Sequence, residues 1–341
     1  MSKPHKSITA QDVADHAGVS RAVVSRALSD KGSIAPETKT KVIAAARELG
    51  YQVNFLAQGL NRKRSQLIGV VVARIKDPFR SSLLEGLIHM IQRRGYQALV
   101  TEVNSDKELE ATMRQFTQFR VSGVIVTSGQ PPATLVNECV QFKIPVVGIN
   151  RELDIPLVDF VCSDNQQGAV LATDHFLKWG CHRFAWLNYA GSTWAGVQRG
   201  LAFEQALESA KVGPHSVQQV IAEQDGYEGG EAAALAFDLS QGLPQGIFCA
   251  NAQLACGFLD GMRQRGFDAP KDFHLIGFDN TPQTAQYSYR LTTLNQDIPA
   301  LCSEALNCLE SRNKSPNQAA RLIKVPVSLV VRYTSPVINL G

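Results

Sequence analysis

Short amphipathic helices are predicted by the apolar and polar positions of the first fifty residues. A capping-box pair at Thr9 and Asp12 starts the first helix, which ends at Gly18 because glycine tolerates the left-handed conformation of a tight turn. The same periodicity predicts a second helix over Arg21–Leu28 and a third over about Pro36–Leu49. Two short helices joined by a glycine-containing turn are typical of a helix-turn-helix unit.

After Gln66 the pattern changes to apolar runs of strand length that alternate with amphipathic helical segments. The strand candidates are Leu67–Ala73, Ala98–Glu102, Gly123–Thr127, Pro145–Ile149, Phe160–Ser163, Phe184–Leu187, Gln218–Ile221, Gly246–Ala250 and Phe273–Gly277. Near-continuous apolar strands with helical crossovers indicate parallel sheets covered on both faces. The rhythm runs once to about Arg151 and again from about Asn165, which predicts two similar lobes with a cleft at the carboxyl ends of the strands. The predicted fold class is α/β, with an N-terminal all-α helix-turn-helix headpiece and a two-lobed, doubly wound parallel α/β domain.

The composition is that of a globular protein, with 44% hydrophobic and 19% charged residues in a chain of 341. The basic start has no apolar stretch behind it, and no apolar run approaches the roughly 20 residues of a membrane span. We therefore expect a cytoplasmic protein with no membrane partner. The seven cysteines form no Cys-x-x-Cys pair, which favours reduced thiols over a disulfide framework or a zinc site.

Positive charge is concentrated in the headpiece. Residues 1–64 carry eleven Lys and Arg against five Asp and Glu, although the net charge of the whole chain is only +3. Such a segment suits a polyanion, and the alternative is a solvated basic tail.

The second helix has the character of a DNA-reading helix. Arg21, Ala22, Ser25 and Arg26 fall on its outer side, where the N-terminal end of such a helix meets base edges in the major groove. An arginine can bind guanine through two hydrogen bonds, while Ser20, Ser25 and the helix N-terminus suit phosphate contacts. Taken alone, the same residues fit a surface helix with two solvated arginines equally well.

Motifs of catalysis are missing from the sequence: it contains no P-loop, no Gly-x-Ser-x-Gly, no paired Cys/His spacing and no Gly-x-Gly-x-x-Gly after the first strand. We therefore expect a ligand-binding module without a cofactor, a metal or catalytic residues.

The headpiece resembles that of the lactose repressor (LacI) family. The matching residues are Asp12-Val13-Ala14, Ala17-Gly18-Val19-Ser20, Val24-Ser25-Arg26, Leu49-Gly50-Tyr51 and Asn54-x-x-Ala57-x-x-Leu60. The resemblance implies a hinge helix over about residues 54–61 that orders on operator DNA, with Leu60 wedged into the minor groove. It also implies that Arg21 and Ala22 help to set operator specificity. The expected DNA contacts are Thr9, Ser20, Arg21, Ala22, Ser25, Arg26, Asn54, Ala57 and Leu60.

The resemblance continues to the end of the chain, and the larger part is also similar to periplasmic sugar-binding proteins. The pieces that carry it include Asp77-Pro78-Phe79, Arg199-x-x-x-Phe203, Ile276-Gly277-Phe278-Asp279-Asn280 and a last strand at Leu329-Val330-Val331-Arg332. It implies a DNA-binding headpiece over residues 1–61 and a two-lobed effector-binding and dimerisation domain over residues 62–341. Only nine residues follow Arg332, too few for a tetramerisation helix, so a homodimer is expected.

By the same resemblance, the effector cleft is formed by Phe79, Asn150, Arg199, Asn251 and Asp279. Trp194, near Arg199, is a further candidate that could stack on a sugar, and the alternative is that it packs within its lobe. An aromatic face can stack on a ring, a carboxylate accepts from paired hydroxyls, and a guanidinium donates in a fork. Apart from Trp194, each of these residues lies just after a predicted strand, where such sheets bind ligands. Asn150 stands where aspartate is frequent, which leaves the ligand class open between a sugar or sugar acid and a purine-like metabolite.

The resemblance as a whole implies a repressor whose operator affinity is controlled by a small molecule. Two rival functions are a transport binding protein, which would need a signal peptide and no basic headpiece, and an enzyme acting on a sugar, which would need a positioned base or nucleophile.

Overall fold

A computed structural model describes residues 8–28, 34–51, 65–127, 136, 138–139, 141–152, 155–212 and 217–337. The chain divides into two compact units, Met1–Ser65 and Gln66–Gly341, which are described separately. In the described parts of the chain, no helix is both long enough and apolar enough to cross a membrane.

The first unit contains the three predicted helices, α1 (Ala10–Ala17), α2 (Arg21–Leu28) and α3 (Pro36–Glu48). The capping box is confirmed, because the Thr9 hydroxyl accepts from the Asp12 amide at 3.3 Å and the Asp12 carboxylate accepts from the Thr9 amide at 2.7 Å. Gly18 has φ 61 and ends α1 in the left-handed conformation. A small apolar core joins the helices, made of Val13, Ala14, Ala17, Val24, Ala27, Val42, Ala45 and Ala46.

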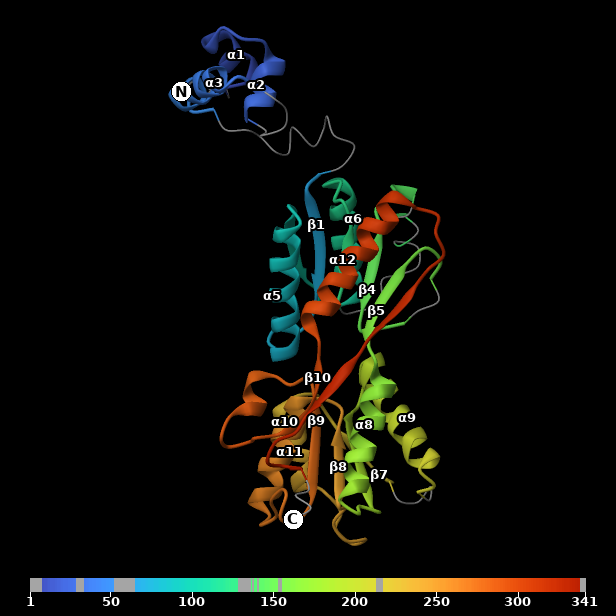
Figure 1. Cartoon of the computed structure of the whole chain (residues 1–341). Helices are drawn as coiled ribbons and strands as arrows, with labels where there is room; N and C mark the ends of the chain where they lie inside the picture. The colour runs from blue at the N-terminus through green and yellow to red at the C-terminus, as the bar shows by residue number, and fades with distance from the viewer. Residues whose placement is uncertain are drawn as a thin grey trace. The chain divides into compact units, whose positions relative to one another are not determined.

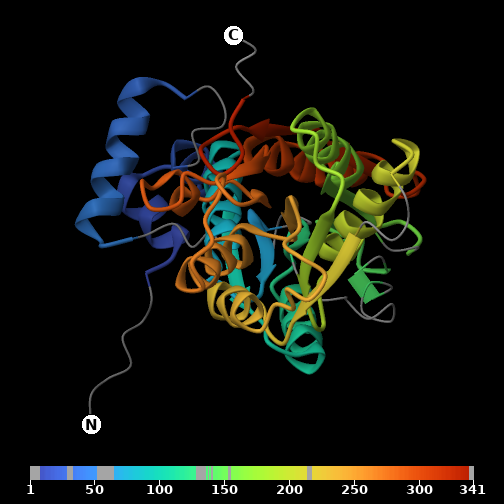
Figure 2. The same cartoon turned by 90° about the horizontal axis from the view of Figure 1, so that it is seen from below.

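The second unit contains two six-stranded sheets, each covered by helices on both faces (Figures 1 and 2). The first sheet is parallel, in the order β11-β5-β4-β3-β1-β2. Its strands are β1 (Leu67–Val72), β2 (Gln97–Glu102), β3 (Val124–Val126), β4 (Val146–Ile149), β5 (Asp159–Ser163) and β11 (Leu322–Val325). Helices α5 (Pro78–Arg93) and α12 (Ile298–Lys314) pack on one face and α6 (Asp106–Gln118) on the other.

The second sheet has the order β12-β10-β9-β8-β6-β7, in which only β12 is antiparallel. Its strands are β6 (Phe184–Tyr189), β7 (Val217–Ala222), β8 (Gly246–Cys249), β9 (His274–Phe278), β10 (Thr292–Gln296) and β12 (Val327–Val330). Helices α8 (Asn165–Lys178) and α9 (Trp194–Ser209) pack against each other, as do α10 (Tyr227–Leu235) and α11 (Ala252–Gln264). A short 3-10 helix, η2 (Pro282–Ala285), precedes β10.

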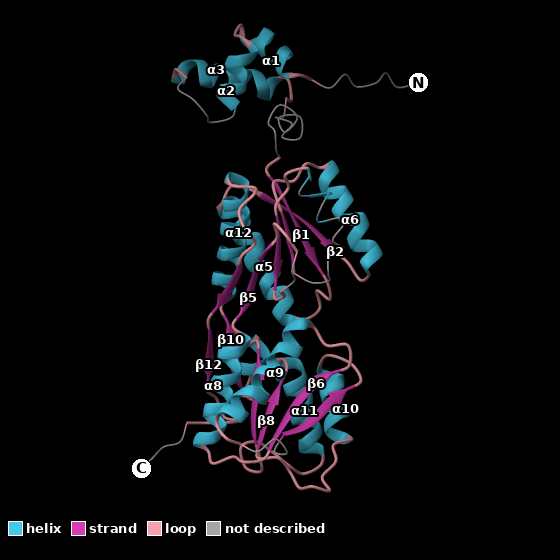
Figure 3. Cartoon of the chain, turned by 90° about the vertical axis from the view of Figure 1, so that its right-hand side faces the viewer, coloured by secondary structure: helices cyan, strands magenta, loops and turns pink. Residues whose placement is uncertain are grey.

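The chain passes between the lobes three times, between β5 and α8, between β10 and α12, and between β11 and β12 (Figure 3). The prediction of two successive halves was therefore wrong in one respect, because α12 and β11 return to the first lobe from the end of the chain. The last strand also differs from the prediction: β12 ends at Val330, so Val331 and Arg332 lie outside it.

Candidate functional site

The exposed side of α2 carries the predicted DNA contacts of the first unit. Arg21, Ala22, Ser25 and Arg26 are all exposed, whereas Val24 and Ala27 of the same helix are buried. The Arg26 Nε donates to the Ala22 carbonyl at 3.3 Å, which holds this side chain along its own helix. Ser20 is exposed and directly precedes α2.

Thr9 differs from the other predicted contacts because its hydroxyl is already engaged in the cap of α1, at 2.7 Å from the Asp12 carboxylate. The remaining three predicted contacts, Asn54, Ala57 and Leu60, and the predicted hinge helix over residues 54–61 lie outside the described residues.

A cleft between the two lobes of the second unit contains the predicted effector site. The cleft has a cavity volume of about 240 Å³, at the small end for ligand pockets. All six predicted effector residues line it: Phe79, Asn150, Trp194, Arg199, Asn251 and Asp279. Residues more than a hundred positions apart are thus brought together at the carboxyl ends of two sheets, as doubly wound folds allow.

The expected position directly after a strand holds for only part of the set. Asn150, Asn251 and Asp279 follow β4, β8 and β9, each within two residues. Phe79 lies instead in the first turn of α5, and Arg199 lies inside α9. A helix can also place a side chain in such a cleft, when its N-terminal turns point at the edge of the sheet. The prediction that each residue directly follows a strand was therefore wrong for these two residues.

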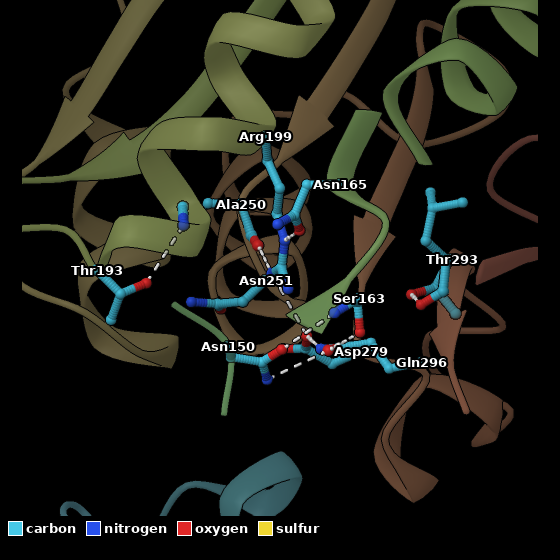
Figure 4. Close-up of polar contacts among 12 residues, drawn as sticks. Asn150, Ser163, Asn165, Thr193, Arg199, Ala250, Asn251, Asp279, Thr293 and Gln296 are labelled. Carbon is cyan, nitrogen blue, oxygen red and sulfur yellow. Dashed lines mark hydrogen bonds and ion pairs between the residues drawn. The ribbon is translucent and has the colours of Figure 1, made fainter. Parts of the chain in front are cut away.

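Arg199 is the most firmly held side chain of the cleft (Figure 4). Its Nε donates to the Asn165 side-chain oxygen at 3.0 Å and its Nη1 donates to the Ala250 carbonyl at 2.6 Å. Its guanidinium carbon lies 3.5 Å from the centroid of the Phe278 ring. These contacts fix the orientation of a side chain that is 5% exposed. No hydrogen bond within the described residues uses Nη2, so this nitrogen can donate to a ligand.

Asp279 supplies an acceptor beside this donor. Its Oδ1 accepts from the Gln296 amide at 2.6 Å and lies 3.4 Å from Arg199 Nη1. Burial raises the pKa of Asp279 to about 6, although the neighbouring Arg199 charge acts in the opposite direction. Oδ2 is not engaged by the described residues and can accept from a hydroxyl of a ligand.

Gln296 is a residue of this site that sequence reasoning missed. Its Oε1 accepts from the Ser163 hydroxyl at 2.6 Å, while its Nε2 donates to Asp279. Ser163 and Gln296 are the last residues of β5 and β10, directly before two of the crossings between the lobes. The acceptor of the cleft is therefore linked through Gln296 to the ends of the two strands that precede these crossings (Figure 4).

Arg74 and Asp225, also missed, form an ion pair across the cleft. Arg74 Nη1 lies 2.6 Å from Asp225 Oδ2, and Arg74 Nη2 donates to the Tyr189 hydroxyl at 3.3 Å. Asp225 additionally accepts from the Asn251 side chain at 2.8 Å. Both charged residues follow strands, β1 and β7, so the strand-end rule could have found them had it been applied to every strand.

The cleft offers three aromatic side chains, fixed donors and a buried acceptor, which suits the reversible binding of a small polar molecule. In the described part of the chain, no three His, Cys, Asp or Glu side chains are placed to hold a metal ion. A helix-turn-helix unit followed in the sequence by a two-lobed binding domain is typical of one class of protein, the ligand-responsive DNA-binding proteins.

Comparison with known proteins gives the family. Residues 9–54 match the model for bacterial regulatory proteins of the lacI family, and residues 173–335 match a periplasmic binding protein-like domain. The HTH-type transcriptional regulator DegA of Bacillus subtilis is 30% identical over 335 residues, covering 97% of this chain and 99% of that protein. A ribose operon repressor of Halalkalibacterium halodurans is 31% identical over 335 residues, covering 96% of this chain and 97% of the relative.

The fold is shared with a crystal structure of the lac repressor dimer bound to operator and the anti-inducer ONPF, with a TM-score of 0.85, 24% identity, and coverage of 97% of this chain and all of that one. The chain therefore belongs to the LacI family of bacterial regulatory proteins and is a DNA-binding transcription regulator with an effector domain. Members of this family are regulators and not enzymes, as the sequence indicated.

Proposed function

We propose that this chain acts as a homodimeric repressor in the cytoplasm, whose affinity for operator DNA changes when a small effector occupies the cleft. The observation that carries the proposal is the hydrogen-bonded path from Asp279 through Gln296 to Ser163, which links the cleft to the crossings between the lobes. A ligand that binds one lobe arrangement better than the other shifts the equilibrium between them by its difference in affinity.

The proposed effector is a sugar, a sugar acid or a similar small metabolite, with a purine-like metabolite as the second candidate. Phe79 and Trp194 would contact its ring, while Asp279 would accept from its hydroxyls. Arg199, Asn251 and Asn150 would donate to its oxygens, since all three line the same cavity. The ribose operon repressor among the relatives supports a small polar ligand.

For the DNA-binding part, we assign residues 1–61 to the headpiece with its hinge helix and residues 62–341 to the effector-binding and dimerisation domain. Arg21 and Ala22 would read bases, while Thr9, Ser20, Ser25 and Arg26 would position the headpiece on the duplex. Asn54, Ala57 and Leu60 would act at the minor groove. The exposure of the α2 residues supports the first part of this assignment.

The proposal is tested by operator binding of the full chain to DNA upstream of its own and neighbouring genes, measured by fluorescence anisotropy at two salt concentrations and with a metabolite panel. We expect a specific complex whose affinity one metabolite changes severalfold. The Arg199→Lys variant keeps the charge but loses the guanidinium fork, and should lose this response, whereas the matched surface variant Arg114→Lys should keep it. Circular dichroism checks that both variants are folded.

Two results would contradict the proposal. Binding that is weak and strongly salt-dependent at every fragment would show phosphate contact without sequence reading. A full response in Arg199→Lys would place the effector somewhere other than in this cleft.

A further inference from the structure

The charges that line the cleft are divided unequally between the two lobes. Four arginines and three aspartates line the cavity in total. The wall formed by the first lobe carries Arg74, Arg80 and Arg151 with one aspartate, Asp77, whereas the wall formed by the second lobe carries Asp225 and Asp279 with Arg199.

Two of these arginines have no carboxylate partner within the described residues. The ion pairs of the cleft use Arg74, which pairs with Asp225 at 2.6 Å, and Arg199, which lies 3.4 Å from Asp279. Arg80 donates through Nη1 to the Ala73 carbonyl at 3.1 Å, and this contact neutralises no charge. The Arg151 side chain takes part in no hydrogen bond of the described residues.

Asp77 compensates for these two charges only in part: its charge acts to raise the pKa of Arg80 against the effect of burial, but among the described residues it forms no ion pair with either arginine, and its carboxylate caps a helix. Its Oδ1 accepts from the Arg80 backbone amide at 2.9 Å and thereby satisfies the first turn of α5. The sixteen-residue helix α5 also directs its positive N-terminal end toward this part of the cleft, since Phe79 and Arg80 of its first turn line the cavity.

Both guanidinium groups are partly desolvated and repel each other. Burial lowers the pKa of Arg80, and the Arg74 charge lowers it further. Burial likewise lowers the pKa of Arg151, followed by the charge of Arg80. Like charges that are partly desolvated and lack an ion-pair partner are unfavourable in the empty cavity, and a bound anion would relieve this repulsion.

We propose that the effector carries an anionic group, a phosphate or a carboxylate, which Arg80 and Arg151 of the first lobe bind, while its polar remainder contacts Asp279, Arg199 and Asn251 of the second lobe. This inference rests on the proposed function of the cleft. Guanidinium groups bind both anions through paired hydrogen bonds, which makes two of them a suitable site. A ligand held at one end by each lobe binds the closed arrangement best, so the charge at one end would also drive closure.

The test compares neutral sugars with counterparts that carry an anionic group. Isothermal titration calorimetry on the full chain measures glucose against glucuronate, glucose against glucose 6-phosphate, and ribose against ribose 5-phosphate, with inorganic phosphate as the minimal probe and chloride at equal ionic strength as the reference. We expect at least one charged sugar to bind about tenfold or more tightly than its neutral counterpart. The arm that succeeds identifies the anion as a carboxylate or a phosphate.

Variants then locate the anion. Arg151→Gln and Arg80→Gln should each weaken binding of the charged sugar about tenfold or more and reduce the difference between the charged and neutral members of a pair. The control is Arg114→Gln, because Arg114 lies on the exposed side of α6, paired with Glu110 in the same helix. Arg151→Gln is the more specific of the two tests, because the Arg151 side chain, unlike that of Arg80, donates no hydrogen bond to a described backbone carbonyl. Thermal melting checks that each variant is folded.

The inference is overturned if neutral and charged members bind equally, if neither variant changes binding of the charged member, or if no charged probe binds at concentrations up to about 10 mM. These results are distinguishable from failure of the proposed function. If a metabolite shifts operator binding without using Arg80 or Arg151, the anion site is wrong but the repressor proposal stands. If charged sugars bind through these arginines and operator binding does not change, the anion site stands but the repressor proposal is wrong.

Discussion

Asp279 is a residue of the cleft whose ionisation is perturbed by burial. The carboxylate is nearly enclosed, with 9% of its side chain exposed, and burial raises its pKa to about 6 from an ordinary value of 3.8. In the folded chain this group therefore binds its proton more tightly than in the unfolded chain. Its contribution to stability is complete below pH 3.8 and is lost as the pH rises through 6, because the unfolded state then ionises first.

We predict that Asp279→Asn, which cannot titrate, gains stability relative to the wild type as the pH is raised from 4 to 7. A shift of this size corresponds to a relative gain of about 3 kcal/mol across that window, as an order of magnitude. Asparagine suits the backbone here, since Asp279 has φ 94 and asparagine tolerates positive φ. Urea denaturation at several pH values measures the difference. Parallel pH dependences of the two proteins would refute the perturbed ionisation.

At the scale of residues, the sequence predicted the cleft only in part. Phe79, Asn150, Trp194, Arg199, Asn251 and Asp279 all line it, although only Asn150, Asn251 and Asp279 directly follow strands. Gln296 was missed because it is the last residue of β10, and neither β10 nor β11 was predicted from the pattern. Thr292 and Thr293 in β10 and Lys324 in β11 break the continuous apolar run by which a buried strand is recognised. Arg151 follows β4 by two residues and could have been found by the strand-end rule, whereas Arg80 lies inside α5 and carries no such signal.

At the scale of elements, α12 illustrates what pattern reading cannot decide. All nine predicted strands are present, and α2 has its predicted bounds. An amphipathic pattern shows which face of α12 is buried but not which lobe buries it. That assignment depends on contacts between residues far apart in sequence. The Arg312 guanidinium of α12 bonds the Asp159 carboxylate of β5 at 2.7 and 3.1 Å, and the Arg321 amide bonds it at 3.0 Å.

We predict that Asp159→Ala strongly destabilises the first lobe. Asp159 is fully buried, and although burial opposes its ionisation, its hydrogen bonds to Arg312 and Arg321 keep its pKa below the ordinary range. Its removal leaves the buried Arg312 charge without its counter-ion, which costs about 3–5 kcal/mol in comparable cases. The midpoint of urea denaturation, followed by circular dichroism, measures the loss.

The matched control for Asp159→Ala is Glu110→Ala, which breaks the exposed ion pair of Glu110 and Arg114 within α6. Such a pair contributes roughly 0.3–0.5 kcal/mol, so the control should hardly move the midpoint. Equal effects of the two variants would show that the Asp159 cluster does not hold α12 and β11 to the sheet.

At the scale of the whole second unit, the three crossings and the Arg74–Asp225 pair have opposite effects on the angle between the lobes: the crossings allow it to change, and the ion pair holds it. Each crossing is a short segment, and two of them contain a helix-capping aspartate, Asp164 for α8 and Asp297 for α12, so little chain resists a change of lobe angle. The Arg74–Asp225 pair instead holds the two walls of the cleft together. Because 44% of the Arg74 side chain is exposed, solvent screening limits this pair to at most about 1 kcal/mol.

The lobe angle can be followed with labels that flank this pair, at Lys76→Cys and Glu223→Cys, both at exposed positions. The native thiols do not compete, because all seven cysteines are buried and burial raises the pKa of each. An excess of unlabelled protein removes energy transfer between subunits.

We predict that Arg74→Gln opens the cleft without unfolding either lobe, since it removes the charge that spans the walls and leaves both cores intact. The closed-to-open ratio should fall by up to about fivefold, the equivalent of 1 kcal/mol, and energy transfer between the two labels should fall with it. The wild type in about 1 M salt should behave like the variant in low salt, because the screening length is then about 3 Å. Arg114→Gln, which breaks a pair inside one lobe, should leave the transfer efficiency unchanged. If Arg74→Gln has no more effect than this control, then closure is held by packing at the crossings, and a charged effector would have to close the lobes without help from this pair.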